Sequence, residues 1–523
     1  MYLVTAKQMQ AIDKTTIESF GIQGQVLMEN AGRGSVEMLL KTFPDISSRK
    51  VCILAGRGNN GGDAFVMARY LMEKNIEINT FLLSSTNKVT GDARVNLILF
   101  EKLAVAESKE GVIEIPNNET FEKHKQKIIN HDIFIDGILG TGLNSDVTGL
   151  FKDVIKTVNS LSKQVFSIDI PSGLNADTGQ PMGECIRATA TATFAFAKIG
   201  HILHPGKELS GNLEIIDIGI PKFIASRENP RIHLIEHDVI KRMFKPREAL
   251  SHKGTYGHLL IVAGSTGKTG AAALAANAAM ASGTGLVTLA VPESINSTIE
   301  PQVTEVMTFP LPENKKGYIT HTALNLIIKK LVSDKKAIAA GPGLGMDDST
   351  IRLVHGMVEE ISLPMVLDAD ALNAIAMNPY ILKNRKAPTI VTPHPGEMAR
   401  MTGKSTAEVQ QNRIDIATQF SAEFNVIVVL KGSSTLIALP DGNVHICPTG
   451  NPGMASGGMG DVLTGLIAGL ITQGFNPSDA AIAGVYIHGL CGDILAQKRG
   501  AFGFVASDII KIIPETIHGK ICL

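Results

Sequence analysis

Gly450–Asp461 reads Gly-Asn-Pro-Gly-Met-Ala-Ser-Gly-Gly-Met-Gly-Asp and leads directly into the apolar run Val462–Leu470. The run has the spacing of a buried helix, so a glycine-rich loop is expected to end at a helix N-terminus. Glycines let the backbone approach a ligand closely, and a helix start adds unpaired N–H donors and partial positive charge. The stretch therefore predicts an anion-binding site suited to phosphate.

Asp461 is the one carboxylate of this stretch and is expected at the edge of the anion site. Bound phosphate would repel a carboxylate, which favours a chemical task for it. That task is to accept the proton of a hydroxyl group that attacks the phosphate. A helix N-cap after a flexible loop is the alternative, purely structural interpretation.

The composition is typical of a globular enzyme. A length of 523 residues corresponds to two to four domains of about 150 residues. Hydrophobic residues make up 44% and charged residues 19% of the chain, and the net charge of −1 gives no basic field for nucleic acid. The five cysteines are scattered, and the N-terminal segment has no long apolar core. We therefore expect a cytoplasmic protein that does not insert into a membrane.

The beginning of the chain reads as helices followed by a nucleotide-binding βαβ unit. Thr5-Ala6-Lys7-Gln8 has the pattern of a capping box and predicts a helix that ends at Gly21. A β-rich run over 50–55, the loop Gly56–Asp63 and a helix over 64–74 follow. The amides, glycines and carboxylate of Asn59–Asp63 predict a ligand-binding loop, with a structural turn as the alternative.

Further strands are expected over 77–83, 131–135, 164–168 and 191–196, alternating with helices. This alternation predicts a doubly wound parallel sheet, whose ligands lie at the carboxyl ends of the strands. Asn60, Asp136 and Ser172 are expected to meet at that edge. Their oxygens suit a hard cation such as potassium better than zinc.

Asp169 and Lys198 each follow one of these strands. A desolvated lysine changes its pKa readily, so the two residues form a candidate acid–base pair. The alternative for Lys198 is a surface charge after a strand.

The second half repeats the alternation of strands and helices. The pattern loosens after Ile220, which places a boundary near 231–244 and predicts domains over 1–230 and 231–523. Gly264–Gly270 lacks the spacing of a Walker A loop and is rejected as one. Lys431–Thr435 combines a cation, a glycine and three hydroxyls, which suits a nucleotide. His394 lies between two prolines and is either functional or structural.

Together these motifs resemble those of the bifunctional NAD(P)H-hydrate repair enzymes over nearly the whole chain. The C-terminal half resembles the ADP- or ATP-dependent NAD(P)H-hydrate dehydratases of the ribokinase-like superfamily, and the N-terminal half resembles the NAD(P)H-hydrate epimerases. One departure is Ala64, where many relatives carry glycine. The resemblance is carried by His252-Lys253-Gly254, Gly341–Gly345, Leu367–Asn373, Thr392–Glu397, Lys431-Gly432, Gly450–Asp461, Gly58–Asp63, Gly137–Gly142, Asp169–Gly173 and Lys198–His201.

The resemblance implies two doubly wound three-layer α/β/α domains, the first Rossmann-like and the second ribokinase-like. The first would interconvert the R and S hydrates of NADH and NADPH. The second would use ADP or ATP to phosphorylate the S hydrate, and loss of phosphate would restore the cofactor. The resemblance also implies potassium in the first domain, magnesium in the second, and a homo-oligomer that binds neither nucleic acid nor membrane.

The resemblance assigns site residues in both domains. Asp461 would be the base of the second domain and would touch the hydrate, while Asp169 and Lys198 stay a hypothesis for proton transfer in the first. The hydrate-binding residues would be Asn59, Asn60, Gly61, Gly62, Asp63, Gly140, Thr141, Gly142, Leu143, Asn144, Ser145, Asp146 and Asp169 in the first domain, and Gly343 and His394 in the second. The potassium ligands would be Asn60, Asp136 and Ser172. The nucleotide would contact Lys431, Gly432, Ser433, Ser434, Thr435 and Gly460, and the anion hole would be Gly457, Gly458, Met459 and Gly460.

Two competing interpretations remain. A kinase for a small alcohol would use the same glycine loop and aspartate base, but it would release a stable phosphate ester. The first domain could instead be a nucleotide-binding module without chemistry, which leaves Asp169 and Lys198 without a role.

Overall fold

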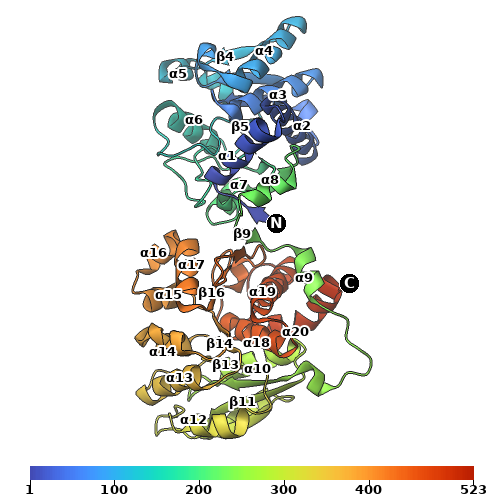
Figure 1. Ribbon diagram of the computed structural model, residues 1–523. Coiled ribbons are helices and arrows are strands. Elements are labelled where there is room, and N and C mark those ends of the chain that lie inside the picture. Colours follow the sequence, from blue (N-terminus) through green and yellow to red (C-terminus); the bar gives the residue numbers. More distant parts are fainter. Residues whose placement is uncertain (523) are drawn as a thin grey trace. The chain divides into compact units, whose positions relative to one another are not determined.

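A computed structural model describes residues 1–522. These residues form two compact units, Tyr2–Ile232 and the chain from His233 onward. Each unit combines a largely parallel sheet with helices, which confirms the predicted α/β class (Figure 1).

The sheet of the first unit has seven parallel strands in the order β4-β3-β2-β5-β6-β7-β8. The order reverses between β2 and β5, so a crevice is expected beside the carboxyl ends of these two strands. The sequence did not predict β4 and β8, because these edge strands are half-exposed and mixed in polarity. The strands are β2 (Val51–Ala55), β3 (Ile78–Leu82), β4 (Val112–Glu114), β5 (Ile133–Gly137), β6 (Gln164–Ile168), β7 (Ala190–Phe194) and β8 (Asn212–Ile216).

Helices cover both faces of this sheet. Ile53 packs with the residues of α2, α3 and α4 on one face, while Leu54 packs with those of α5 and α6 on the other. Alternate strand residues therefore enter two cores, and the unit has three layers. The capping box at Thr5 starts α1, and a π-helical turn extends it to Gly21, as predicted. The helices are α1 (Ala6–Lys14), α2 (Gly24–Thr42), α3 (Asn59–Glu73), α4 (Gly91–Ala106), α5 (Asn118–Ile129), α6 (Gly149–Ser160), α7 (Gly206–Ser210) and α8 (Lys222–Arg227).

The sheet of the second unit contains seven parallel strands in the order β12-β11-β10-β13-β14-β15-β16. The antiparallel strands β17 and β18 continue it beyond β16, and β9 lies next to β18. The order reverses between β10 and β13. The strands are β9 (Ile232–Leu234), β10 (His258–Val262), β11 (Leu286–Pro292), β12 (Met307–Leu311), β13 (Ala337–Ala340), β14 (Met365–Leu367), β15 (Thr389–Val391), β16 (Ile427–Leu430), β17 (Leu436–Ala438) and β18 (Val444–Ile446).

Helices also lie on both sides of this second sheet. α10, α18, α19 and α20 cover one side, and α12 to α17 lie on the other (Figure 1). The helices are α9 (His237–Met243), α10 (Thr269–Ala281), α11 (Glu293–Ile299), α12 (Ala323–Leu326), α13 (Asp348–Glu360), α14 (Asp370–Met377), α15 (Pro395–Thr402), α16 (Thr406–Gln411), α17 (Arg413–Phe424), α18 (Met459–Thr472), α19 (Pro477–Arg499) and α20 (Ala506–Thr516).

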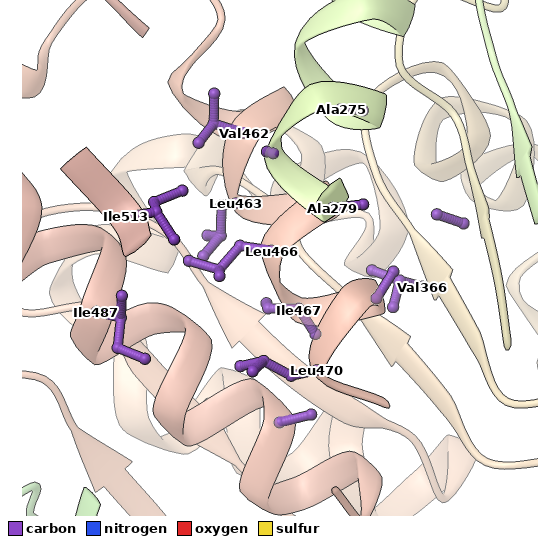
Figure 2. Close-up of a cluster of buried hydrophobic side chains, with 14 of the residues drawn as sticks. Ala275, Ala279, Val366, Val462, Leu463, Leu466, Ile467, Leu470, Ile487 and Ile513 are labelled. Carbon is purple, nitrogen blue, oxygen red and sulfur yellow. The ribbon is translucent and has the colours of Figure 1, made fainter. Parts of the chain in front are cut away.

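The predicted apolar helix after the glycine loop is α18, and it lies in the centre of the core (Figure 2). Leu466 and Leu470 are fully buried, and burial of each such side chain stabilises the fold by about 1.5–3 kcal/mol. Gly465 lets α10 approach closely, because a Cβ there would lie 2.0 Å from the carbonyl oxygen of Ala275. The N-terminus of α18 is therefore held by a rigid core.

Helix α19 is the one described helix whose length and composition would suffice to cross a membrane. Most of its apolar window, 72%, is buried inside the structure. Its apolar residues pack on α18, as Ile487 shows in Figure 2. The apolarity of α19 is that of a core helix.

Candidate active sites

In the first unit, Asn59–Asp63 forms the first turn of α3. The expected helix start at Ala64 was therefore wrong by five residues. Glycines disfavour a helix locally, but here they allow α3 to rest on the preceding loop. A Cβ at Gly61 would lie 1.8 Å from the carbonyl oxygen of Gly56. α3 follows β2, one of the two strands at which the strand order reverses, so a helix N-terminus with its N–H donors lies at the expected crevice.

The three predicted cation ligands lie together beside this turn. The carboxylate of Asp136 accepts hydrogen bonds from the Ser172 hydroxyl at 2.5 Å and from the Ser172 N–H at 2.8 Å. The amide nitrogen of Asn60 donates to the Leu139 carbonyl at 3.0 Å, and the Ser172 hydroxyl lies 3.2 Å from the same carbonyl. The other polar side-chain atom of Asn60, the amide oxygen Oδ1, is buried and has no hydrogen-bond partner among the described residues. Burial raises the pKa of Asp136, although the Ser172 hydrogen bonds oppose this.

Asp169 and Lys198 form a buried ion pair. The Lys198 ammonium donates to Asp169 Oδ1 at 2.5 Å and to the Thr193 hydroxyl at 2.9 Å. Lys198 is only 1% exposed, which excludes the surface-charge interpretation. Burial alone would raise the pKa of Asp169, but Lys198 outweighs it and the pKa lies below its ordinary value. Asp169 also has a left-handed φ of 62°, an uncommon and costly conformation for a residue with a Cβ.

Three more titratable side chains face this pair. Burial raises the pKa of Asp63 well above its ordinary value and that of Asp13 to about 6, while both side chains also interact with Asp169 and Lys198. His201 is buried, and its Nδ1 accepts the N–H of Lys198 at 3.1 Å. The sequence pattern did not indicate a role for Asp13 or His201, because neither directly follows a strand.

The predicted binding loop 140–146 begins at this site. A Cβ at Gly140 would lie 3.5 Å from the Cβ of Asn60, so the loop starts directly beside α3. Residues 144–146 are mostly exposed. The structure thus brings Gly140 to the crevice, while the far end of the loop lies at the surface.

In the second unit, the glycine loop meets α18 as the sequence predicted. Gly458 is the N-cap with a φ of 87°, and Met459 and Gly460 begin the helix. Asp461 lies in the first turn and makes no capping hydrogen bond, so the N-cap interpretation does not hold. Burial and then the charge of Asp368 raise the pKa of Asp461 to about 7.

A largely buried cation, Lys431, lies beside this helix start. The Lys431 ammonium donates to Asp368 Oδ1 at 2.6 Å, and the Thr464 hydroxyl donates to Asp368 Oδ2 at 2.8 Å. A Cβ at Gly460 would lie 3.2 Å from Lys431 Nζ. Burial would lower the pKa of Lys431, but Asp368 and Glu397 outweigh it and raise the pKa, so the ammonium stays charged. The sequence motifs gave Lys431 a role but none to Asp368, Thr464 or Glu397, although Asp368 and Glu397 lie within motifs that carry the resemblance.

Gly343 lies at the reversal of strand order in this unit, after β13. Its φ of 66° favours glycine, and its carbonyl accepts the Ser265 hydroxyl at 2.7 Å. Lys268 pairs with Asp370 at 2.9 Å, and Asp370 also accepts the N–H of Gly345 at 2.8 Å. Lys268 is thus engaged with a carboxylate, in line with the rejection of a Walker A loop.

His394 has a structural task in addition to its place at the rim. It is the N-cap of α15, and its Nδ1 accepts the N–H of Gly396 at 3.0 Å. Burial and then Lys431 lower the pKa of the imidazole, and the acceptor role of Nδ1 leaves Nε2 as the ring nitrogen that carries a proton. Half of the side chain is exposed.

The predicted nucleotide loop connects β16 with β17. Ser434 is buried with a left-handed φ of 52°, and the Thr435 hydroxyl donates to the carbonyl of Gly432 at 3.0 Å. Gly432 and Ser433 are exposed. The loop is therefore a tight turn that begins at the largely buried Lys431 and opens to solvent.

Comparisons with known proteins match both halves of the chain. The family described as NAD(P)H-hydrate dehydratase matches residues 259–515, and the family described as YjeF-related protein N-terminus matches residues 24–200. A bifunctional NAD(P)H-hydrate repair enzyme of Moorella thermoacetica is 41% identical, covering 99% of this chain and 97% of its own. The enzyme of Thermofilum pendens is 35% identical, covering 99% and 96%.

A solved structure matches the second half. It is an ADP/ATP-dependent NAD(P)H-hydrate dehydratase from Bacillus subtilis, co-crystallised with ATP and Mg²⁺. Its sequence is 33% identical, the match covers 55% of this chain and 98% of that chain, and the TM-score is 0.48. The full-length relatives cover both units, and the chain therefore belongs to the family of bifunctional NAD(P)H-hydrate repair enzymes, as its motifs predicted.

Proposed function

We propose that this chain repairs hydrated NADH and NADPH with two activities. The first unit interconverts the R and S hydrates, and the second dehydrates the S hydrate at the expense of ADP or ATP. The observation that carries the proposal is Asp461, a carboxylate with a pKa of about 7 in the first turn of α18, beside the buried Lys431.

In the second unit, Asp461 accepts the proton of the ring hydroxyl as its oxygen attacks the terminal phosphorus of the nucleotide. The bond from phosphorus to the leaving nucleotide breaks and releases AMP from ADP, or ADP from ATP. The C–O bond to the new phosphate then breaks, a proton leaves the neighbouring carbon, and the ring double bond is restored. Each turnover yields one NADH or NADPH and one phosphate.

The other predicted residues hold the reactants in line. The N–H groups of Gly457–Gly460 and the Lys431 ammonium stabilise the transferring phosphate, because they are fixed before the reaction. Lys431–Thr435 and Gly460 bind the nucleotide. Gly343 and His394 contact the hydrate, and His394 offers its Nε2–H as a donor.

Magnesium is expected to accompany the nucleotide. Among the described residues, no cluster of three or more His, Cys, Asp or Glu side chains is arranged to hold a metal. Mg²⁺ often binds through one or two carboxylates together with substrate phosphates and water, and the carboxylates near Asp461 fit that mode. When bound, it neutralises charge on the phosphates.

In the first unit, Asp169 and Lys198 carry protons to and from the hydrate, which is bound by Asn59–Asp63 and residues 140–146. The pair is suited to this because Lys198 lowers the pKa of Asp169, which places an ionised acceptor beside an N–H donor. Asn60, Asp136 and Ser172 fit potassium, since Asn60 Oδ1 is a buried oxygen without a partner among the described residues. The ion would supply a positive charge beside the buried Asp136.

The first experiment supplies pure S hydrate with ADP or ATP in separate reactions and measures NADH, phosphate and nucleotide products. Equal amounts of NADH, phosphate and AMP or ADP are expected. A stable phosphorylated hydrate without NADH would support the small-alcohol kinase.

The second experiment supplies pure R hydrate without nucleotide and follows the R to S ratio by NMR. Equilibration faster than the spontaneous exchange is expected for the wild-type chain and not for Asp169→Ala. Equal rates with and without protein would make the first unit a binding module.

We further propose a cytoplasmic homo-oligomer with the epimerase in residues 1–230 and the dehydratase in residues 231–523. The described cysteines form no disulfide with one another, which suits a reducing compartment. Phe20 and Phe223 form an edge-on pair and are about half exposed, an apolar surface suited to a second copy. Light scattering of the purified chain tests the oligomer, and a monomer would contradict it.

A further inference from the structure

The start of the glycine loop is attached to α19 by one carboxylate. Asp493 Oδ2 accepts the backbone N–H of Gly450 at 2.9 Å, and its Oδ1 accepts the side-chain amide of Asn451 at 2.9 Å. Both oxygens of Asp493 are thus used on adjacent residues of the loop. Hydrogen bonds to an ionised acceptor are among the stronger ones in proteins.

Asn451 extends this link into the loop. Its Oδ1 accepts the N–H of Gly453 at 3.0 Å, while its Nδ2 donates to Asp493. The Asn451 amide therefore has a fixed orientation, because the oxygen must face one donor and the nitrogen must face the carboxylate. The chain of contacts runs from α19 through Asn451 to the 3₁₀ turn Pro452–Met454.

The same face of α19 contacts the rest of this segment. The Thr449 hydroxyl donates to the carbonyl of Tyr486 at 2.9 Å. A Cβ at Gly489 would lie 2.4 Å from Thr449 Oγ1, and one at Gly492 would lie 2.3 Å from Met454 Sδ. Tyr486, Gly489 and Asp493 are spaced by three and four positions and therefore lie on one face of α19. Segment 449–454 packs along this face.

The loop is also held from its other side before it reaches α18. A Cβ at Gly453 would lie 2.6 Å from the Phe504 ring and 2.7 Å from the carbonyl of Ala501. A few residues further along, the chain enters the anion hole at Gly457 and is capped at Gly458. The place of these N–H groups therefore depends on how segment 449–454 is seated.

We propose that Asp493 is a positioning residue for phosphoryl transfer, which acts through Asn451 to seat the anion-hole loop. The proposal rests on the dehydratase function given above. A fixed loop keeps its N–H groups directed at the transferring phosphate, and such preorganised donors contribute most in the transition state. Asp493 itself touches neither phosphate nor hydrate.

The arrangement of donors and acceptors gives a sharp test. In Asp493→Asn a single amide oxygen faces two donors, the Gly450 N–H and the Asn451 side-chain amide, so one of the two hydrogen bonds is lost. Asn451→Asp places two carboxylates against each other. When Asn451→Asp and Asp493→Asn are combined, the carboxylate at position 451 accepts from Gly453 and from the amide nitrogen at position 493. The amide oxygen at position 493 still accepts from Gly450, so every hydrogen bond is restored, with the direction of one of them reversed.

We expect each single variant to lower dehydratase kcat by about ten- to a hundredfold, with a smaller effect on the nucleotide KM. The double variant should return kcat to within about threefold of wild type. The epimerase activity of the same chains is the matched control, because it reports the amount of intact chain without using this loop. Thermal unfolding of each variant separates loop misplacement from loss of the second unit.

Wild-type kcat in Asp493→Asn would overturn the inference, and so would a double variant as slow as the single ones. A loss of kcat that only follows a lower unfolding temperature would also overturn it. If the wild-type chain shows no dehydratase activity at all, the proposed function has failed instead, and the two failures are distinguished by the wild-type rate.

Discussion

At the scale of single residues, Asp461 has a raised pKa at a position where a lowered one is expected, and a chemical task explains this difference. A helix N-terminus ordinarily stabilises an ionised carboxylate, which would lower its pKa. Burial and the neighbouring Asp368 act against this and raise the pKa of Asp461 to about 7. A carboxylate that titrates near neutral pH is a more effective proton acceptor than an exposed one.

The raised pKa predicts the pH profile of the dehydratase. Asp461 must be ionised to accept a proton, so kcat/KM with the S hydrate should rise with pH and level off above about 7. Below that pH the rate should fall about tenfold for each pH unit, because the ionised fraction falls by that factor. If kcat/KM stays constant between pH 5 and 8, roughly the range in which a group of this pKa titrates, the rate does not depend on the ionisation of Asp461.

Asp461→Asn tests the same residue without changing its shape. Turnover should fall by about two to four powers of ten, because the amide cannot accept the hydroxyl proton. Nucleotide affinity, measured by calorimetry, should not fall, since the carboxylate repels phosphate. Near-normal turnover would remove Asp461 from the role of base.

At the scale of elements, the long periodic segments were predictable and the start of α3 was not. The apolar spacing of Val462–Leu470 and the alternation of strands and helices follow from local sequence. The helical first turn of α3 depends on its contact with Gly56, which no local pattern shows. Local sequence also marks residues at the ends of strands and helices, which is why Asp461, Asp169 and Lys198 could be predicted. Asp13 and Asp493 could not, because they lie inside helices that are distant in sequence from the loops they serve.

The close contact at the start of α3 gives a prediction for this element. Gly61→Ala would put a Cβ 1.8 Å from a backbone carbonyl, so the first turn of α3 must shift. We expect loss of epimerase activity and a lower unfolding temperature of the first unit. Gly58→Ala is the matched control, because nothing lies within 4 Å of a Cβ at that position. Equal activity in both variants would contradict the packing argument.

At the scale of the whole molecule, each unit has its own parallel strands and its own core, and each carries the candidate site residues assigned to it. Such units are expected to fold separately. Neither site should therefore borrow residues from the other half of the chain. The two activities are useful on one chain because they act in sequence on one substrate.

Separate expression of residues 1–230 and 231–523, which leaves β9 intact, tests this independence. The first piece should equilibrate R and S hydrates, the second should dehydrate the S hydrate alone, and an equimolar mixture should consume both. Hydrate recovery by the mixture at a rate far below that of the intact chain would contradict independent sites.

An experiment that starts from pure R hydrate decides whether this one chain carries both repair activities. The intact enzyme receives it with ADP or ATP, and the absorbance of the dihydronicotinamide ring is followed. We predict complete recovery of NADH with one of the nucleotides, and recovery limited to the slow spontaneous exchange in Asp169→Ala. If the wild-type chain recovers R hydrate no faster than the spontaneous exchange while consuming S hydrate, the epimerase activity is contradicted. No recovery of NADH from either hydrate would contradict both activities.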